Sequence, residues 1–367
     1  MTTSNPFKFG SVVDDPYFTN RVKELQEVKR LLQSQNHLIL ISPRRYGKTS
    51  LLLKAVHALD RPYVFLDIQL VTGVSDFASQ LLKRIYRIYP FEHLKQLIKH
   101  FSILPALNVN PLTNEVDISF QPVEKANPLL TDIFNLLENL GKKGKRPIVI
   151  LDEFQDIFKL APDLDKQLRA VIQHHNHVNY AFLGSMESMM RDIFEKKKSS
   201  FYHFGQLMIL DKIPYEDFYN YLMKGFDKKC PQKETLCNKI LAFTKQHPYY
   251  TQQLAYTLWE DCKNDMHADR LFKLTIEKLI KMHDVDYERL WQTFNQTDKK
   301  LMILLSTVQN VNILSEKIMR KHNLPAASTM YSSIKRLIKQ GYIVKTNAKY
   351  ELDDPFFTEW IKRKREE

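Results

Sequence analysis

The sequence predicts an α/β domain built on a parallel sheet, followed by an all-α domain and a C-terminal winged helix-turn-helix. Three observations predict this plan. Short apolar runs alternate with amphipathic segments as far as about residue 210, which is the order of strands and crossover helices in a parallel sheet. Helical periodicity alone follows from Asp211 to Arg289. The last part holds three short helical stretches and then two short strands, the order of a winged helix.

We therefore expect three domains: an α/β domain over residues 1–210, an all-α lid domain over residues 211–295 and a winged-helix domain over residues 296–367. A hydrophobic content of 44% is enough to fill more than one core. Within the first domain, residues 105–121 hold two alternating runs around the turn residues Asn110–Asn114. This pattern predicts a β-hairpin inserted at the edge of the sheet.

The stretch Leu38–Lys54 contains a short apolar strand, a compact loop and an amphipathic helix that opens on Gly47, Lys48 and Thr49. This is the order of a P-loop, in which backbone N–H groups and a helix N-terminus surround a phosphate. Lys48 would reach the β- and γ-phosphates of ATP, and Thr49 would offer its hydroxyl to Mg²⁺. The stretch therefore predicts an ATP and magnesium site.

One residue departs from the P-loop pattern G-x-x-x-x-G-K-[ST], because Ser42 stands at the first glycine. Serine lacks the backbone freedom that this position often needs, although Pro43 and the preceding strand are able to hold a conformation that suits serine. The alternative is an ordinary strand, turn and helix in which the GKT sequence is incidental. A second phosphate-site motif would decide between the two.

That second motif follows the strand Ile148–Leu151, which runs directly into Asp152 and Glu153. A buried parallel strand delivers such acids to its carboxyl edge, as a Walker B strand does. Asp152 would hold Mg²⁺ directly or through water, and Glu153 would orient or deprotonate the attacking water. With the P-loop about a hundred residues earlier, the two motifs predict a P-loop NTPase.

Ser185 follows the next predicted strand, Asn179–Leu183 and Gly184. In P-loop ATPases a small polar residue beside the Walker B strand often senses the γ-phosphate, and Ser185 stands where it is expected. A turn serine that caps the following helix is an equally good interpretation. Nearby, His174, His175 and His177 have no acidic or cysteine companions at ligand spacing, so we do not expect a metal there.

Helical spacing and breaking residues place the other elements. A helix begins after Asn20, its expected N-cap, and Arg61-Pro62 precedes the strand Tyr63–Ile68. Gly141 is expected to end one helix, and residues 190–210, around Lys196–Lys198, are expected to form a solvated loop. The expected helices are Thr49–Leu59, Val74–Tyr89, Leu129–Leu140, Asp165–His175, Tyr215–Phe226, Glu234–Lys245, Pro248–Asn264 and Ala268–Val285.

The C-terminal region predicts helices at Thr297–Val308, Ser315–His322 and Ala327–Gln340, and a wing formed by Tyr342–Val344 and Lys349–Leu352. This region holds 14 Lys and Arg against 8 Asp and Glu. Its net charge of +6 is half of the +12 carried by the whole chain. Such a basic module suits phosphate contacts with double-stranded DNA. Winged helices also dock proteins or inhibit their own chain, and a basic surface is often only solvated, so these interpretations stay open.

Cysteine and hydropathy patterns bear on the compartment. Cys230, Cys237 and Cys262 are odd in number and lack metal-ligand spacing, which favours a reducing cytoplasm over a disulfide framework. The first ten residues have no basic flank before an apolar core, and no segment approaches eighteen uninterrupted apolar residues. We therefore expect neither a signal peptide nor a membrane span.

With these motifs in view, the chain resembles the archaeal/bacterial ATPase family of the STAND group, within the AAA+-like P-loop NTPases and related in plan to archaeal origin-recognition ATPases. The residues that carry the resemblance are Phe18–Arg21 with Glu24-Leu25, Ser42–Leu51, Leu151–Gln155, Gly184-Ser185, His247–Tyr250 and Asp354–Phe357 with Trp360.

The resemblance implies ATP binding in a cleft between the α/β and helical domains. Asn20, Arg21 and Glu24 would lie near the adenine, and Pro248 would lie in the helical segment that packs back on the nucleotide. The loop residues that it assigns to the nucleotide are Pro43, Arg44, Arg45, Tyr46, Gly47, Lys48, Thr49 and Ser50.

Two positions depart from the family pattern. Gln246 stands where the family often has glycine, and Gly205-Gln206 stands where it often has Gly-Arg. If that arginine meets the γ-phosphate, its absence affects the rate of hydrolysis rather than nucleotide binding. Arg44, Arg45 and Arg191 are candidate substitutes, among which the sequence does not choose.

Three functions are compatible with these motifs. The first is an ATPase that hydrolyses Mg-ATP to ADP and phosphate and acts as a nucleotide-driven conformational switch. The second is a DNA-binding regulator whose nucleotide is structural or slowly hydrolysed. A P-loop kinase for a small molecule fits less well, because Glu153 suits water activation. Expected partners are ATP or ADP, double-stranded DNA and an unidentified protein, without a membrane.

Overall fold

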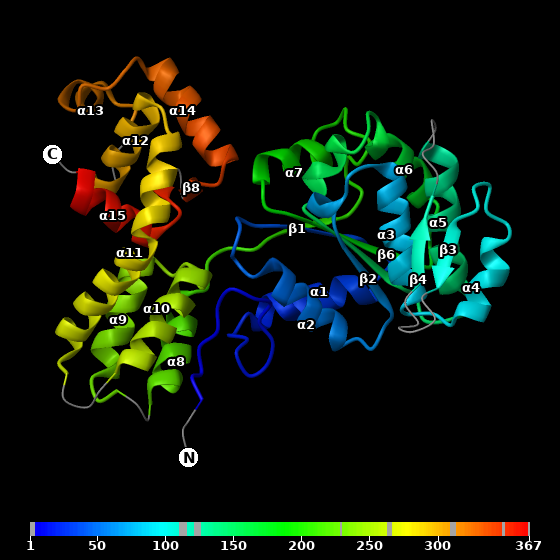
Figure 1. Cartoon of the computed structure of the whole chain (residues 1–367), viewed down its shortest axis with the longest axis horizontal. Helices are drawn as coiled ribbons and strands as arrows, with labels where there is room; N and C mark the ends of the chain where they lie inside the picture. The colour runs from blue at the N-terminus through cyan, green and yellow to red at the C-terminus, as the bar shows by residue number, and fades with distance from the viewer. Residues whose placement is uncertain are drawn as a thin grey trace. The chain divides into compact units, whose positions relative to one another are not determined.

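The computed structural model describes residues 4–109, 116–120, 126–227, 230–262, 266–308, 313–346 and 349–365. The expected hairpin turn at 110–114 and the wing turn at 347–348 lie outside the described residues. Contacts divide the chain into two compact units, and Figure 1 colours them along the chain. The first unit comprises Met1–Asn20, Pro43–Gly47 and Lys212–Glu367, and the second comprises Arg21–Ser42 and Lys48–Asp211.

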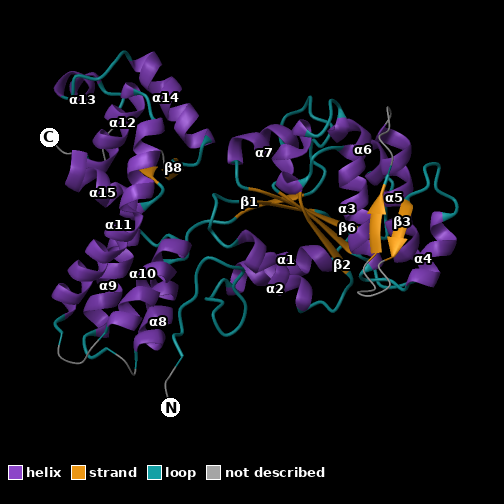
Figure 2. Ribbon diagram, viewed as in Figure 1, coloured by secondary structure: helices purple, strands orange, loops and turns teal. Residues whose placement is uncertain are grey.

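The second unit is built on a five-stranded parallel sheet in the order β2-β5-β6-β1-β7 (Figure 2). The strands are β1 (Leu38–Ile41), β2 (Tyr63–Asp67), β5 (Ile148–Asp152), β6 (Asn179–Gly184) and β7 (Gln206–Ile209). The sequence predicts the first four. It does not predict β7, because this half-exposed edge strand of four residues lacks the continuous apolar run of the buried strands.

Helices cover both faces of this sheet: α1 and α2 lie on one face, and α3, α5, α6 and α7 on the other (Figure 1). Side chains alternate between the faces, since Ile39 and Ile41 join the core under the second group of helices while Leu38 and Leu40 are buried on the opposite face. The helices are α1 (Val22–Gln33), α2 (Lys48–His57), η1 (Ile68–Leu70), α3 (Val74–Tyr86), α4 (Phe91–Ile98), α5 (Ala126–Lys143), η2 (Phe154–Lys159), α6 (Leu164–Ile172) and α7 (Glu187–Phe194).

Four expectations for this unit are wrong. Residues 190–210 are not a solvated loop throughout, because Met190–Phe194 belong to α7, Phe201 is buried and Gln206–Ile209 form β7. Helix α5 continues through Gly141, where a Cβ atom would lie 2.0 Å from the His177 carbonyl oxygen, so the glycine permits a close approach rather than ending the helix. The N-cap of α1 is Arg21, with φ of 59°, and not Asn20. The hairpin strands β3 (Ala106–Val109) and β4 (Val116–Ser119) form a separate sheet, and β4 packs on α3.

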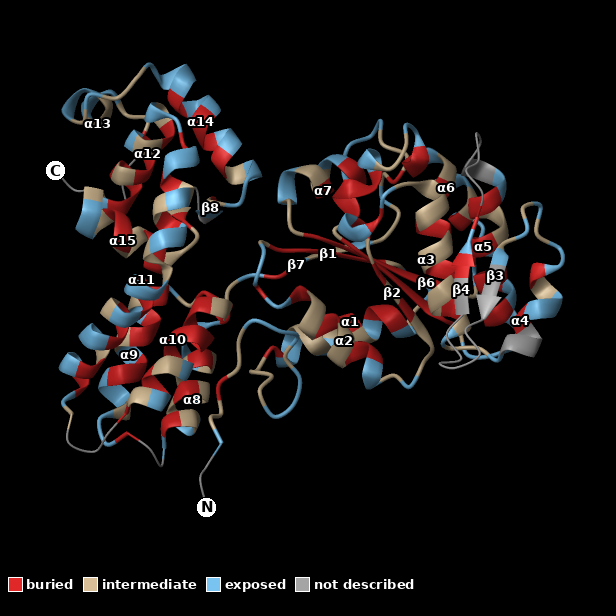
Figure 3. Cartoon of the chain, viewed as in Figure 1, coloured by how far each residue is buried: buried red, intermediate tan, exposed pale blue. Residues whose placement is uncertain are grey.

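The first unit is mainly helical and ends in a winged helix, as the sequence predicts. One hydrophobic core runs through it from Phe7 to Ile361, and the buried residues line the inner faces of its helices (Figure 3). Its elements are α8 (Tyr215–Phe226), α9 (Lys233–Thr244), α10 (Pro248–Asp261), α11 (Ala268–Thr293), α12 (Gln296–Thr307), α13 (Glu316–Lys321), α14 (Ala327–Lys339), β8 (Ile343–Thr346), β9 (Lys349–Leu352) and α15 (Pro355–Arg365).

Helix α15 has no counterpart among the predicted elements. The Asp354 carboxylate starts it by accepting hydrogen bonds from the backbone N–H groups of Phe356 and Phe357, at 2.8 and 3.1 Å. Tyr287 of α11 donates its hydroxyl to the same carboxylate at 3.1 Å. The motif Asp354–Phe357 therefore joins the wing to the long helix α11.

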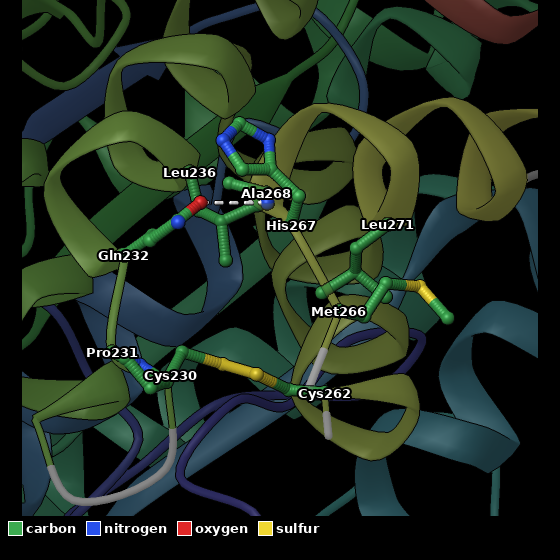
Figure 4. Close-up of a pocket in the computed structure, with 9 residues that line it drawn as sticks. All are labelled: Cys230, Pro231, Gln232, Leu236, Cys262, Met266, His267, Ala268 and Leu271. Carbon is green, nitrogen blue, oxygen red and sulfur yellow. Dashed lines mark hydrogen bonds between the residues drawn. A yellow bond between two sulfur atoms is a disulfide. The ribbon is translucent and has the colours of Figure 1, made fainter. Parts of the chain in front are cut away.

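A disulfide joins Cys230 and Cys262, whose Cα atoms are 6.1 Å apart, and Cys237 is a buried free thiol. The expectation of reduced cysteines is therefore wrong for this pair, because a separation of 32 residues gives no spacing pattern. Figure 4 shows the bond beside a cavity of about 210 Å³ with no charged aspartate, glutamate, lysine or arginine among its described lining residues. This cavity does not have the chemistry of a nucleotide site.

The histidines near the start of β6 hold this end of the sheet together. His175 Nδ1 is hydrogen-bonded to the Tyr180 hydroxyl at 2.7 Å, and His177 Nδ1 to Glu138 Oε1 at 2.7 Å. The ring of His37 packs edge-on against Tyr180. Among the described residues, no group of three or more His, Cys, Asp and Glu is placed to hold a metal ion. Within the same residues, no helix combines the length and apolar character that crossing a membrane requires.

Acid should destabilise the second unit, which contains His37 and His175. Burial lowers the pKa of both His37 and His175 from 6.5 to about 4. The unfolded chain therefore takes up protons below pH 6.5 that the folded chain refuses until about pH 4, and stability is lost as the pH falls through this window. We expect the free energy of unfolding to fall by about 2 kcal/mol per histidine between about pH 7.5 and about pH 5.

Chemical unfolding followed by circular dichroism at the two pH values measures this loss. The double variant His37→Gln/His175→Gln should show a much flatter pH dependence. A wild-type stability that does not change between the two pH values would contradict the argument.

Candidate nucleotide site

The two motifs meet because the sheet is parallel. Strand β6 lies between β1 and β5, and the register pairs Ile41 with Gly184 and Leu151 with Phe182. The carboxyl ends of the three strands therefore share one edge of the sheet. The residues that follow these ends are the phosphate loop, the acidic pair and Ser185. Sequence reasoning predicted all three.

Ser42 does not need the backbone freedom of glycine. It is 1% exposed, its N–H donates to the Gly184 carbonyl at 3.2 Å, and it is not among the residues with positive φ. The left-handed positions of the loop are Arg45, with φ of 65°, and Gly47, with φ of 89°. Ser42 therefore has a conformation that suits serine, and Gly47 supplies the unusual one, while the part assigned to Pro43 stays a prediction.

Lys48 and Thr49 begin helix α2 and face the acids of β5. The Lys48 side chain is 7% exposed, with Nζ 3.7 Å from Glu153 Oε1. The Thr49 hydroxyl donates to Asp152 Oδ2 at 3.1 Å. A hydroxyl and a carboxylate oxygen brought together in this way are the ligand types that Mg²⁺ prefers. Thr49 and Asp152 thus fit the magnesium role that the sequence assigns to them.

The pKa values of the two acids shift in opposite directions. Burial raises the pKa of Asp152 above its ordinary value, although the Lys48 ammonium acts in the opposite sense. Burial acts in the same direction on Glu153, but the Lys48 ammonium and hydrogen bonds from Ser185 and Gln155 outweigh it and hold the pKa of that carboxyl below 4.5. Glu153 is therefore ionised at neutral pH and able to accept a proton.

Ser185 contacts Glu153 and does not cap a helix. Its hydroxyl donates to Glu153 Oε2 at 2.5 Å, and its N–H donates to the same oxygen at 3.2 Å. Helix α7 begins two residues later, with Met186 as its N-cap and no side-chain capping bond. The capping interpretation of Ser185 is wrong, and a direct γ-phosphate contact remains a prediction.

Gln155 is a site residue to which sequence reasoning gave no role, although it ends the stretch Leu151–Gln155 that carries the family resemblance. Its side chain is 1% exposed, and its amide donates to Glu153 Oε2 at 2.5 Å. The available signal was the run Phe154–Ile157, in which two polar residues lie between two apolar ones. A buried polar side chain in such a run requires a hydrogen-bond partner.

The loop arginine Arg45 points to the helical segment after α9. This residue belongs to the first unit, where its guanidinium lies 4.7 Å from the ring centroid of Tyr249 and donates to the Tyr250 hydroxyl at 2.9 Å. Tyr46 is buried, with its ring edge-on to His247 at 4.9 Å. The stretch His247–Tyr250 therefore packs against the loop residues Arg45 and Tyr46.

The candidate substitutes for a γ-phosphate arginine differ in their surroundings. Arg44 is exposed, whereas Arg191 forms ion pairs with Glu187 and Glu195 along α7 at 2.9 and 2.8 Å. Gln206 pairs with Leu38 at the amino edge of the sheet. An arginine at position 206 would start at the edge opposite the phosphate loop, so the concern that Gln206 weakens hydrolysis has no support from this register.

The remaining predicted residues lie at element ends. Arg21 is 6% exposed and pairs with Glu24 at 3.0 Å, and Asn20 precedes it with φ of 35°. Pro248 is the first residue of α10, which suits proline because that position has no intrahelical N–H bond to lose. Their contact with adenine, and that of Ser50 in α2 with phosphate, stay predictions.

The other departure, Gln246, has a local explanation. Its φ is 58°, in the left-handed region that favours glycine, and its side-chain amide donates to the Leu241 carbonyl at 3.1 Å. This bond holds the turn before His247 without glycine.

Replacing Ser42 by glycine should not improve ATP binding, because the backbone at this position is already in an ordinary conformation. Ser42→Gly should leave the ATP dissociation constant within about twofold and lower the free energy of unfolding by ~0.5 to 1 kcal/mol through added freedom of the unfolded chain. Nucleotide titration and thermal unfolding measure the two effects. A clear gain in affinity would mean that serine strains the loop.

The sequence matches two known domain families and several known proteins. Residues 18–254 match the model of an ATPase domain predominantly from Archaea, and residues 285–363 match that of a probable winged helix domain. An uncharacterized ATP-binding protein of Pyrococcus abyssi is 28% identical over 187 residues, and one of Methanocaldococcus jannaschii is 24% identical over 262 residues. These alignments cover 47% and 64% of the chain, and 54% and 66% of the relatives' lengths.

Solved structures show the same fold. A Walker-type ATPase of Pyrococcus abyssi aligns with a TM-score of 0.69 at 17% identity, over 97% of this chain and 99% of that one. The ORC2 protein of Aeropyrum pernix, in ADPNP and ADP complexes, aligns with a TM-score of 0.53 at 15% identity, over 97% and 98% of the two chains. Because the first family model covers well over half of the residues, the chain belongs to the family of ATP-binding ATPases whose domain occurs predominantly in Archaea.

Proposed function

We propose that this chain binds Mg-ATP and hydrolyses it to ADP and phosphate, and that it acts as a nucleotide-driven conformational switch. The observation that carries the proposal is the meeting of Lys48, Thr49, Asp152 and Glu153 at one edge of the sheet. An ammonium group, two magnesium ligands and an ionised carboxylate are the groups that phosphoryl transfer to water requires.

In this proposal, Lys48 binds the β- and γ-phosphates at the N-terminus of α2, and Thr49 and Asp152 hold magnesium. The ion would supply positive charge against the phosphate oxygens. Glu153 takes the proton of the attacking water, because its carboxylate stays ionised at neutral pH. Asn20, Arg21 and Pro248 are proposed to lie near the adenine.

The proposal is tested by ATP turnover and nucleotide titration. Lys48→Ala should weaken ATP binding by at least about tenfold, because it removes the phosphate-binding charge. Glu153→Gln should bind ATP normally and lose roughly a hundredfold in turnover, because an amide does not act as a base. Unaltered turnover in both variants would overturn the assignment.

Two variants control for the loss of a charge alone. Lys166→Ala removes an exposed lysine of α6, and Glu27→Gln neutralises a half-buried glutamate of α1. Neither should change binding or turnover. If they act as strongly as the site variants, the losses report general destabilisation.

The switch would act through the helical unit. Arg45 of the phosphate loop contacts Tyr249 and Tyr250 at the start of α10, so a change in the loop would act directly on this helix.

A cytoplasmic location and an unidentified protein partner belong to the same proposal. The Cys230–Cys262 disulfide weighs against a strongly reducing compartment, and an intact mass of the native protein with alkylated thiols would measure how much of it forms.

A second candidate function is DNA binding by the winged helix, with nucleotide as a structural or slowly hydrolysed ligand. Helix α14 presents Tyr331, Lys335 and Lys339 on its exposed face, and Lys345 and Lys349 of the wing are also exposed. Lysines around an exposed helix and a wing are suited to phosphate contacts across a groove. This arrangement favours duplex DNA over an uncharged partner.

DNA binding is tested by titrating duplex DNA over a range of salt concentrations. Lys335→Glu/Lys339→Glu should weaken binding at least about tenfold and reduce the salt slope by about 2, because two phosphate contacts are lost. Lys273→Glu/Lys281→Glu in α11 makes the same charge change elsewhere and should have a smaller effect. Equal effects of the two pairs, or undetectable binding by the wild type, would reject this function.

A further inference from the structure

Three hydrogen-bond donors meet on one oxygen of Glu153. The Ser185 hydroxyl and the Gln155 amide each donate to Oε2 at 2.5 Å, and the Ser185 N–H donates to it at 3.2 Å. The other oxygen, Oε1, takes none of these bonds and faces Lys48 Nζ at 3.7 Å. The two oxygens of the carboxylate therefore have different surroundings, one anchored and one directed toward the lysine.

The backbone brings Gln155 into this position. Glu153 has φ of 50° and ψ of 44°, a left-handed conformation that is uncommon for a residue with a side chain. The chain then turns into η2, whose first residues place the Gln155 side chain back against the carboxylate. Backbone conformations of this kind cluster at functional sites.

Packing does not explain a glutamine at position 155. The side chain is 1% exposed, and its Oε1 is a buried acceptor without a hydrogen-bond partner within the described part of the chain. Its neighbours in the same run, Phe154 and Ile157, belong to the hydrophobic core. Leucine or methionine would fill this volume without leaving an unpaired oxygen. The feature that only the amide provides is the N–H directed at Glu153.

Gly184 makes room for this arrangement. A Cβ atom on Gly184 would lie 2.7 Å from Gln155 Oε1 and 2.3 Å from Met190 Cγ. The glycine before Ser185 therefore lets the glutamine lie against the end of β6. The two short motifs Asp152–Gln155 and Gly184-Ser185 are thus parts of one arrangement around Glu153.

We propose that Gln155 and Ser185 are positioning residues that hold Glu153 Oε2, so that Oε1 alone is presented to the attacking water. This inference rests on the proposed hydrolysis of ATP. Without the two anchors the carboxylate is free to rotate onto Lys48, where a closer ion pair would withdraw it from the water. Ser185 thus acts through Glu153 and not through the γ-phosphate.

The test compares Ser185→Ala and Gln155→Leu with wild type by steady-state ATP hydrolysis. Each should lower kcat by at least about tenfold while KM and the nucleotide dissociation constant stay within about threefold, because ground-state binding is untouched. The acid limb of the pH–rate profile should move to higher pH, since a carboxylate that loses donors protonates more readily. Ser185→Thr keeps a hydroxyl and should recover most of kcat.

Two matched variants separate positioning from a merely structural effect. Ser200→Ala removes a serine hydroxyl that donates to Asp165 at 2.6 Å, and Gln167→Leu removes a glutamine whose Oε1 is also buried without a partner. Both lie in the same unit and should leave kcat and the pH profile unchanged. If they lower kcat as strongly, or if Ser185→Ala weakens ATP binding tenfold, the positioning role is rejected.

A readout without turnover keeps the inference distinct from the proposed function. The three hydrogen bonds to Glu153 Oε2 should contribute to the stability of the fold. Ser185→Ala should therefore unfold at a lower temperature than wild type. In a Glu153→Ala background, which has no carboxylate to hold, this difference should be much smaller.

If the wild type does not hydrolyse ATP yet this coupling is present, the proposed function fails and the anchoring of Glu153 stands. If hydrolysis depends on Glu153 but neither kcat nor the coupling responds to Ser185 and Gln155, the anchoring fails and the proposed function stands.

Discussion

The candidate site depends on keeping one carboxylate ionised while it is enclosed. Glu153 is 13% exposed and Lys48 is 7% exposed, so each charge has lost most of its water. Burial alone would favour the neutral form of Glu153, and the nearby Lys48 ammonium offsets this cost. The hydrogen bonds from Ser185 and Gln155 add to this balance. The chemistry proposed for Glu153 therefore rests on contacts that come from three separate strand ends.

The phosphate loop has a second set of neighbours besides the sheet. Its left-handed residue Arg45 contacts Tyr249 and Tyr250, and the ring of Tyr250 lies against Phe356 of α15. The charge of Arg45 also lowers the pKa of Asp354, although burial of that carboxyl is the larger effect and raises it. Arg45, which the sequence assigns to phosphate, therefore contacts aromatic rings of the first unit. These contacts suit a structural role better than a catalytic one.

Much of this site is predictable from sequence because local patterns carry it. The run Ile148–Leu151 before two acids, and the GKT sequence after Leu38–Ile41, each specify a strand end. Because the carboxyl ends of parallel strands lie at one edge of the sheet, the sequence also predicts that the two motifs meet. Other features that the sequence did not predict depend on contacts between distant residues. Gly141 faces the His177 carbonyl oxygen, and Cys230 meets Cys262 across 32 residues. No local pattern marks either contact.

The uninterrupted core from Phe7 to Ile361 has a consequence for how the helical part of the chain folds. Residues of the N-terminal segment, of α8 to α12 and of α15 belong to one apolar cluster, so no layer of polar surface separates the winged helix from the helices before it. Regions that share one core open together and not one after another. The winged helix is therefore part of a larger cooperative folding unit, and cutting the chain before α12 would expose the apolar faces of both pieces.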